Sequence, residues 1–263
     1  MDKLRVNNLD IWYRVDGSGP WLVLIMGLTA SMDWWDPGFT DALARNYRLL
    51  MFDNRGAGRT TSPDEDFSIS QMAGDTAALM QKLEISRASV LGFSMGGMIA
   101  QELALEYPLA VERLVLCATF PGGRESILAD REVLLKLVDR SGSGPEVVKR
   151  FASLLFPPGW LEENPGYLKD FTRRYLAAPA SNRNATRQFM ATTRFKAGDR
   201  LGGINIPTMV ACGDSDVIIP GENSRILAKR IPGARLVEYP GAGHGFITQC
   251  REEFLRDLRG FLD

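Results

Sequence analysis

The segment Gly92-Phe93-Ser94-Met95-Gly96-Gly97 contains a serine with the spacing G-x-S-x-G. It follows a short apolar run typical of a buried strand and begins a segment with helical character. A serine on so sharp a strand-to-helix turn exposes its hydroxyl, and the neighbouring glycines avoid Cβ clashes inside the turn. A purely structural glycine-rich turn would look the same, but the strand–turn–helix context favours Ser94 as a nucleophile.

A serine hydroxyl needs a base to become a nucleophile, and the chain has one histidine, His244. It lies in Gly241-Ala242-Gly243-His244-Gly245, between the last predicted strand and the last predicted helix. A lone histidine often has no chemical task. The flanking glycines and the position after the final strand nevertheless favour His244 as the base for Ser94.

A carboxylate should orient the imidazole and stabilise its charged form. The segment after the penultimate strand offers Asp214 and Asp216. Asp214 directly follows Gly213, where aspartate commonly bonds to its own backbone in a turn. We favour Asp216, which lies deeper in the loop and fits the chain order Ser, Asp, His. Either carboxylate would also serve to cap the helix that follows.

The tetrahedral intermediate of such a reaction carries a negative oxygen, which needs at least two preorganised donors. One should be the backbone N–H of Met95, the residue after the nucleophile. The other should come from the loop that begins at Gly27, and we assign it to the N–H of Leu28. The loop would otherwise be an ordinary strand-to-helix connection.

The elements that would position these residues alternate between strand and helix character, which indicates an α/β fold with a mostly parallel, doubly wound sheet. Strands are expected at residues 4–7, 11–15, 21–26, 49–52, 88–93, 111–118, 207–213 and 235–239. Helices are expected at residues 37–45, 70–83, 95–107, 127–138, 147–155, 167–176, 222–230 and 251–262.

No buried strand is predicted between residues 121 and 203, where helical stretches are broken by glycine and proline. We therefore expect residues 1–120 and 204–263 to form one α/β core, with residues 121–203 as a helical insertion. The chain shows neither an internal repeat nor a low-complexity tract.

Composition excludes several classes of function. The 31 lysines and arginines nearly balance the 32 aspartates and glutamates, which gives a net charge of −1 and no basic surface for nucleic acid or anionic membrane. One histidine and three scattered cysteines supply neither a multi-histidine metal centre nor a disulfide framework. No glycine-rich phosphate or dinucleotide motif follows a strand, so we expect no metal and no cofactor. The amino terminus lacks the pattern of a secretory signal, and we expect a cytoplasmic protein.

Five motifs follow one another along the chain, and as a set they are highly specific: the Gly27 loop, Asp53-x-Arg55-Gly56-x-Gly58, Gly92-x-Ser94-x-Gly96-Gly97, Gly213-x-x-Asp216 and Gly243-His244. Taken together, they resemble the α/β-hydrolase fold superfamily over nearly the whole sequence. The set looks most like the small capped serine esterases and lactonases, such as 3-oxoadipate enol-lactonase-like and aclacinomycin methylesterase-like enzymes.

The resemblance implies that residues 121–203 form a cap over the active site. One departure concerns the oxyanion loop, where many relatives have His-Gly and this chain has Met26-Gly27. The support that the histidine gives must therefore come from other residues or be absent. We read the turn from Asp53 to Gly58 as structural, packed near the site without a catalytic role.

The expected reaction is hydrolysis of a small-molecule carboxylic ester or lactone through an acyl-enzyme. Serine-triad C–C bond hydrolases, cofactor-free haloperoxidases or perhydrolases, and slow-turnover ligand receptors of the same fold remain alternatives. Trp34, Trp160 and Phe246 are expected to line an apolar substrate pocket. The cationic side chains of Arg173 and Arg174 could bind a carboxylate, so a carboxylated lactone remains a candidate substrate. A position on a solvated helix face explains the two arginines as well. The oligomeric state is not readable from the sequence.

Overall fold

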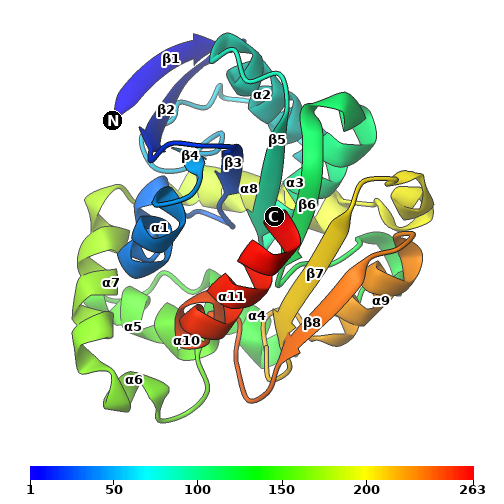
Figure 1. Ribbon diagram of the computed structural model, residues 1–263. Coiled ribbons are helices and arrows are strands. Elements are labelled where there is room, and N and C mark those ends of the chain that lie inside the picture. The colour runs from blue at the N-terminus through cyan, green and yellow to red at the C-terminus, as the bar shows by residue number, and fades with distance from the viewer.

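The computed structural model describes residues 1–263 and contains one sheet of eight strands in the order β1-β2-β4-β3-β5-β6-β7-β8 (Figure 1). Strands β1 and β2 form an antiparallel hairpin, and β2 also runs antiparallel to β4, whereas all later neighbours are parallel. The strands are β1 Asp2–Val6, β2 Leu9–Asp16, β3 Trp21–Ile25, β4 Arg48–Phe52, β5 Ala88–Phe93, β6 Val111–Cys117, β7 Thr208–Gly213 and β8 Arg235–Tyr239. The predicted α/β fold is confirmed.

Helices cover both faces of the sheet, as the apolar runs of the central strands require. On one face, side chains such as Val23 and Val90 pack against α2 and α3. On the other, Leu24 and Leu91 pack against α1 and α11. The helices of this core are α1 Pro37–Ala44, α2 Ile69–Lys82, α3 Met95–Glu106, α9 Glu222–Arg230, α10 Phe246–Gln249 and α11 Arg251–Leu262. No helix is both long enough and apolar enough to cross a membrane.

The segment between β6 and β7 is helical, as predicted. Its α-helices are α4 Arg131–Val138, α5 Gly144–Leu155, α6 Trp160–Glu163, α7 Pro165–Ala177 and α8 Asn182–Arg194. Helices α5, α6 and α7 lie together at one end of the sheet (Figure 1). The only strand-like pairing here is the isolated bridge between Gly122 and Lys196.

Helix α8 is absent from the sequence prediction. Its sequence NRNATRQFMATTR is mostly polar, with four apolar residues among thirteen, so the apolar face that identifies surface helices is small. A local start signal does exist, because the Ser181 hydroxyl caps the helix by accepting from the Asn184 N–H at 3.2 Å. The short helices α6 and α10 were not predicted either.

Candidate active site

Ser94 lies between the end of β5 and the start of α3 in a strained backbone conformation, with φ +56° and ψ −121°. Its N–H donates to the Cys117 carbonyl at 2.8 Å, and its carbonyl accepts from the Gly97 N–H at 2.8 Å. A non-glycine residue at positive φ costs roughly 1–3 kcal/mol and persists only when its surroundings hold it. The two hydrogen bonds are such a restraint.

Glycine is required at positions 92 and 96 of this turn because backbone atoms of other residues lie very close to each of them. A Cβ on Gly96 would lie 2.0 Å from the Ile25 carbonyl oxygen. A Cβ on Gly92 would lie 2.3 Å from the Gly96 carbonyl oxygen. The spacing predicted from the sequence thus has a specific steric cause at both positions.

His244 and Asp216 are in contact. His244 Nδ1 lies 2.7 Å from Asp216 Oδ2, and both side chains are almost fully buried. The other carboxylate oxygen of Asp216 accepts from the N–H groups of Ile218 at 2.8 Å and Ile219 at 2.9 Å. The carboxylate is therefore held by its own loop with one oxygen directed at the imidazole.

Asp214 has a different environment. Its side chain is exposed and accepts from the Gly241 N–H at 2.7 Å and from the Ser215 hydroxyl at 2.9 Å. These contacts join two loops at the ends of β7 and β8. The structure thus places Asp216, and not Asp214, against the imidazole of His244.

Ser94 and His244 line the same cavity, and the imidazole packs against Phe93 with ring centroids 5.0 Å apart. The ring makes its one hydrogen bond to Asp216, and none joins it to the Ser94 hydroxyl. Contacts between a nucleophile and its base are often long without substrate and tighten in the reacting complex. The structure therefore brings the three residues to one site with the Asp–His contact already formed.

The glycines beside His244 leave room for the end of α5 to pack closely on the histidine loop. The Gly245 N–H donates to the Leu155 carbonyl at 2.7 Å. A Cβ on Gly243 would lie 2.6 Å from the same carbonyl oxygen, and one on Gly245 would lie 2.6 Å from the ring of Phe156. The histidine loop is thus packed directly under the end of α5, and this close approach requires glycine at positions 243 and 245.

The two N–H groups assigned to an oxyanion site are positioned to donate. Leu28 N–H makes no backbone hydrogen bond. Met95 is the first residue of α3, where N–H groups have no acceptor within the helix and carry the positive end of its dipole. The loop at Gly27 packs closely on the turn that carries Ser94, since a Cβ on Gly27 would lie 3.1 Å from the Ser94 Cβ.

Three side chains hold the loop that begins at Gly27 by hydrogen bonds to its backbone. Asn54 Nδ2 donates to the Met26 carbonyl at 2.9 Å, and Asp53 Oδ1 accepts from the Met32 N–H at 2.7 Å. Gln188 Oε1 accepts from the Thr29 N–H at 2.7 Å. Asp53 and Asn54 lie in the turn that we read as structural, whereas Gln188 comes from the unpredicted helix α8.

Two apolar cavities meet at Ser94. The histidine-side cavity, of about 100 Å³, is lined by Trp34, Trp35, Phe93, Phe151, Phe171 and His244 among others. The methionine-side cavity, of about 190 Å³, is lined by Met95, Met98, Phe120, Leu134, Phe189 and Phe195 among others. Both are bounded by Leu28, Ser94, Leu137 and Ile218.

Of the three aromatic residues predicted to line the pocket, Trp34 lines the histidine-side cavity, whereas Trp160 and Phe246 line neither cavity. Trp160 stacks on Phe156 with ring centroids 4.0 Å apart and lies outside both cavities. Phe246 is fully buried against Tyr239, at 5.1 Å between centroids. The prediction for Trp160 and Phe246 is wrong because aromatic side chains near a site also serve to pack its walls.

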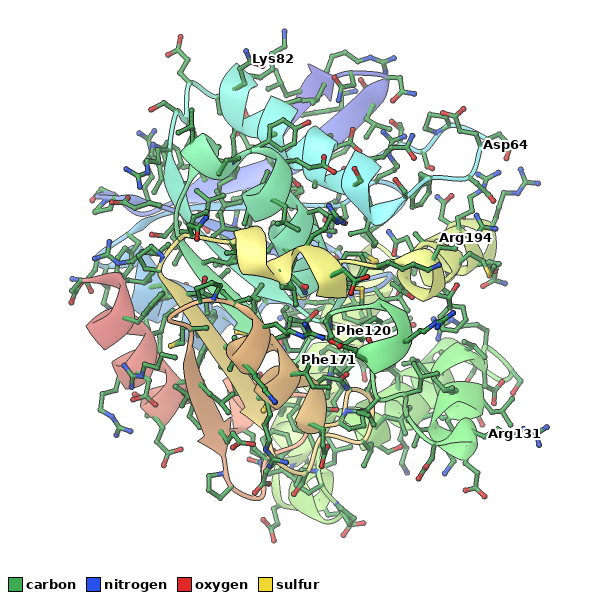
Figure 2. All side chains as sticks on the ribbon, turned by 90° about the vertical axis from the view of Figure 1, so that its right-hand side faces the viewer. Asp64, Lys82, Phe120, Arg131, Phe171 and Arg194 are labelled. Carbon is green, nitrogen blue, oxygen red and sulfur yellow. The ribbon has the colours of Figure 1, made fainter.

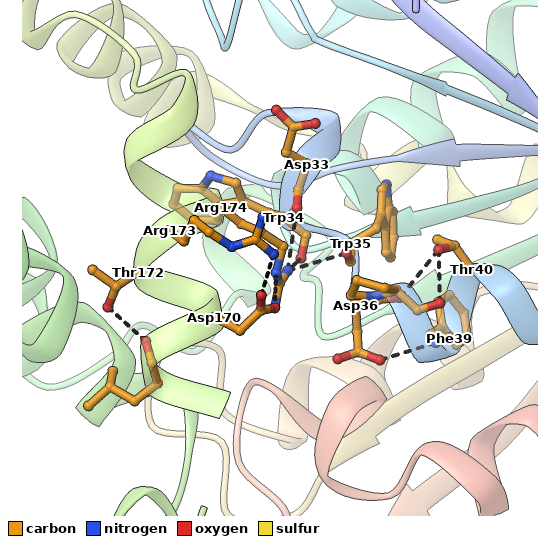
Figure 3. Close-up of polar contacts among 12 residues, drawn as sticks. Asp33, Trp34, Trp35, Asp36, Phe39, Thr40, Asp170, Thr172, Arg173 and Arg174 are labelled. Atoms are coloured by element: carbon orange, nitrogen blue, oxygen red, sulfur yellow. Dashed lines mark hydrogen bonds and ion pairs between the residues drawn. The ribbon is translucent and has the colours of Figure 1, made fainter. Parts of the chain in front are cut away.

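The two arginines considered for binding a substrate carboxylate lie outside both cavities as well. Arg173 is exposed and pairs with Asp170. Arg174 is buried, bonds to Asp170 at 2.8 Å and donates to the Trp34 carbonyl at 2.8 Å (Figure 3). Arg174 therefore fastens α7 to the loop that carries Trp34. The cation that lines the histidine-side cavity is instead Arg140.

No group of three or more His, Cys, Asp or Glu side chains converges as metal ligands do. Burial raises the pKa of the Cys212 thiol to about 11, and the pKa of Cys117 is also raised by burial. These thiols are protonated at neutral pH and do not compete with Ser94 as nucleophiles.

Comparisons with known proteins agree with this geometry. A family model described as the alpha/beta hydrolase fold matches residues 20–248. "Putative carbamate hydrolase RutD" of Pseudomonas syringae pv. syringae is 33% identical over 245 residues, covering 92% of this chain and 93% of the relative. The protein of the same name from Azorhizobium caulinodans is 29% identical over 253 residues, covering 96% and 94%.

The crystal structure of an enol-lactonase from Burkholderia xenovorans LB400 is similar along its full length. The TM-score is 0.86 at 27% identity, with 99% of each chain covered. The matched family model spans strands β3 to β8, the turn that carries Ser94 and the loop that carries His244. These matches show that the chain is a hydrolase and that it belongs to the α/β hydrolase fold family.

Proposed function

We propose that this protein is a serine hydrolase that cleaves an uncharged carboxylic ester or lactone. The observation that carries the proposal is the buried 2.7 Å contact of Asp216 with His244, in a cavity that the strained Ser94 also lines. An oriented base beside an exposed hydroxyl is the arrangement that acyl transfer requires. The mostly apolar lining of both cavities supports an uncharged substrate.

In the proposed reaction, Ser94 Oγ attacks the carbonyl carbon while His244 Nε2 takes the hydroxyl proton. Asp216 holds the ring with its Nδ1 proton directed at the carboxylate and stabilises the imidazolium that forms. The N–H groups of Leu28 and Met95 bind the oxyanion. Collapse of the intermediate breaks the ester bond, and His244 gives its proton to the departing alcohol. Water then repeats the sequence on the acyl-enzyme.

The two cavities also suggest how a substrate lies. The departing alcohol receives its proton from His244, which lines only the histidine-side cavity. The alcohol portion should therefore lie in that cavity and the acyl portion in the methionine-side cavity. We further propose that residues 121–203 act as a cap, because α4, α5 and α7 contribute lining residues such as Leu137, Phe151 and Phe171.

A carbamate is the second candidate substrate, because the relatives reported above carry that activity in their names. The same residues can attack a carbamate carbonyl. The apolar lining on both sides of Ser94 favours esters and lactones, since a small carbamate would leave most of that surface without contact.

The test is a panel of short-chain p-nitrophenyl esters, aliphatic lactones and alkyl carbamates, each assayed with the wild-type protein and Ser94→Ala. We expect ester or lactone turnover that Ser94→Ala abolishes. Leu134→Trp, which narrows the methionine-side cavity, should lower kcat/KM for hexanoate esters far more than for acetate esters. Turnover that persists in Ser94→Ala would overturn the proposal. Faster turnover of carbamates than of esters and lactones would identify a carbamate as the substrate class instead.

A further inference from the structure

Gln188 connects helix α8 to the oxyanion loop although 159 residues separate it from Thr29. Its Oε1 accepts from the Thr29 N–H at 2.7 Å, and its Nε2 donates to the Arg55 carbonyl at 2.8 Å. The side chain is fully buried. The Arg55 contact fixes which end of the amide faces Thr29, because only the NH₂ group can donate to a carbonyl.

The loop that Gln188 touches has a strained turn at its centre. The Ala30 N–H donates to the Gly27 carbonyl at 3.3 Å, which makes Leu28 and Thr29 the two central residues of a turn. Thr29 has φ +61°, the sign that a type II turn requires at its third residue and that normally selects glycine there. A β-branched residue in this conformation is unfavourable and needs an external restraint.

A local alternative would relieve that strain. Rotation of the peptide group between Leu28 and Thr29 converts a type II turn into a type I turn, in which the third residue has negative φ. The Thr29 N–H would then point away from Gln188, and ψ of Leu28 would change by about 150°, which rearranges the loop around Leu28. The hydrogen bond to Gln188 is present only in the strained form.

Helix α8 is a rigid support for this contact. A Cβ on Gly56 would lie 3.0 Å from the Asn184 side chain, so α8 packs directly on the turn that follows Asp53. Arg187 donates to the Pro63 carbonyl at 3.1 Å and pairs with Asp64. Figure 2 shows the Asp64 loop beside the helix that ends at Arg194.

We propose that Gln188 is a positioning residue for the oxyanion site. By holding the Thr29 N–H, it keeps the Gly27–Ala30 turn in the strained form and aims the free Leu28 N–H at the site beside Ser94. The inference rests on the proposed function, because it assumes that the Leu28 N–H binds an oxyanion.

The test compares Gln188→Met with Gln101→Met. Gln101 is the matched control, since it is another fully buried amide with two hydrogen bonds, at 3.1 Å each to the Gly97 and Phe120 carbonyls, and it does not touch the oxyanion loop. Loss of an oxyanion donor lowers kcat by about 100- to 1000-fold, so a misaimed donor should lower it by roughly 10- to 100-fold. We expect that fall in kcat for Gln188→Met, with KM changed less than about threefold.

Rescue separates positioning from general destabilisation. Adding Thr29→Gly to Gln188→Met removes the penalty for positive φ, and we expect this double variant to recover about tenfold in kcat. Gln188→Glu keeps an acceptor for the Thr29 N–H and should retain more activity than Gln188→Met, which also covers the case in which the methionine variant folds poorly.

Hydrogen exchange at the Thr29 amide gives a readout that needs no substrate. We expect faster exchange in Gln188→Met than in the wild type or in Gln101→Met. Unchanged Thr29 exchange together with unchanged kcat would overturn the inference, as would equal losses of kcat in Gln188→Met and Gln101→Met. Absence of ester and lactone turnover in the wild type would instead refute the proposed function, while the exchange experiment would still report on the turn.

Discussion

Replacement of Asp216 should separate catalysis from stability, because its two carboxylate oxygens have different partners. One oxygen contacts His244 Nδ1, and the other accepts from the N–H groups of Ile218 and Ile219. In Asp216→Asn, the amide oxygen can keep the two N–H contacts. The NH₂ group then faces Nδ1 and favours the tautomer that carries its proton on Nε2, which cannot act as a base. A loss of roughly 10⁴-fold in kcat is expected, with little change in stability.

Asp216→Ala should lose both catalytic activity and stability. The Ile218 and Ile219 N–H groups would have no acceptor, and each unsatisfied buried donor costs about 1–3 kcal/mol. Ile218 is only partly buried, so we expect a total of about 3 kcal/mol, or a Tm lower by roughly 6–12 °C. The Tm of Asp216→Asn should lie close to that of the wild type.

The assay measures kcat on a p-nitrophenyl ester and Tm for both variants, with Asp214→Asn as the control. Asp214 is exposed and bonds only to turn groups, so Asp214→Asn should keep kcat within about threefold. The assignment would be refuted by a loss of kcat smaller than about tenfold in Asp216→Asn, or by a larger loss in Asp214→Asn.

Two further predictions concern the walls of the site and the thiols. Arg174→Met should destabilise the protein by about 2 kcal/mol and raise KM, because it removes charged hydrogen bonds that hold the Trp34 loop. Chemical denaturation measures the change in stability, and steady-state kinetics measure the change in KM. The neighbouring exposed Arg173→Met should change stability by less than about 0.5 kcal/mol, and an equal effect of both would contradict this role. Burial raises the pKa of Cys212 and of Cys250 to about 11, so at pH 8 only about one thiol in a thousand is ionised. Iodoacetamide labelling followed by mass spectrometry should therefore be slow at both in the folded protein and become faster as pH rises toward 11; rapid labelling at pH 8 would be inconsistent with this burial.

Features that depend on neighbouring residues in the chain were predicted well. The apolar runs of the central strands and the glycine spacing around Ser94 act over a few residues, so the sequence displays them directly. The order of strands and helices then restricts the fold to a wound parallel sheet, in which the loops bearing Ser94 and His244 follow strands at the same edge.

The walls of the site were predicted less well. Trp160 and Phe246 have the same residue types as Trp34, and only packing decides that they stack in the interior while Trp34 faces the cavity. The preference for Asp216 over Asp214 likewise came from turn chemistry, and the direct contact with His244 is a property of the folded loops.

The sequence by itself thus determined the fold class, the sharp glycine-rich turn at Ser94 and the presence of a single histidine, because these follow from local sterics and composition. Tertiary structure alone decided which side chains support the oxyanion loop. Gln188 belongs to a mostly polar helix with few apolar residues, and it meets Thr29 only because α8 packs on the turn at Gly56. A hydrogen bond between residues so far apart in the chain depends on the packing of whole elements, which no local pattern encodes.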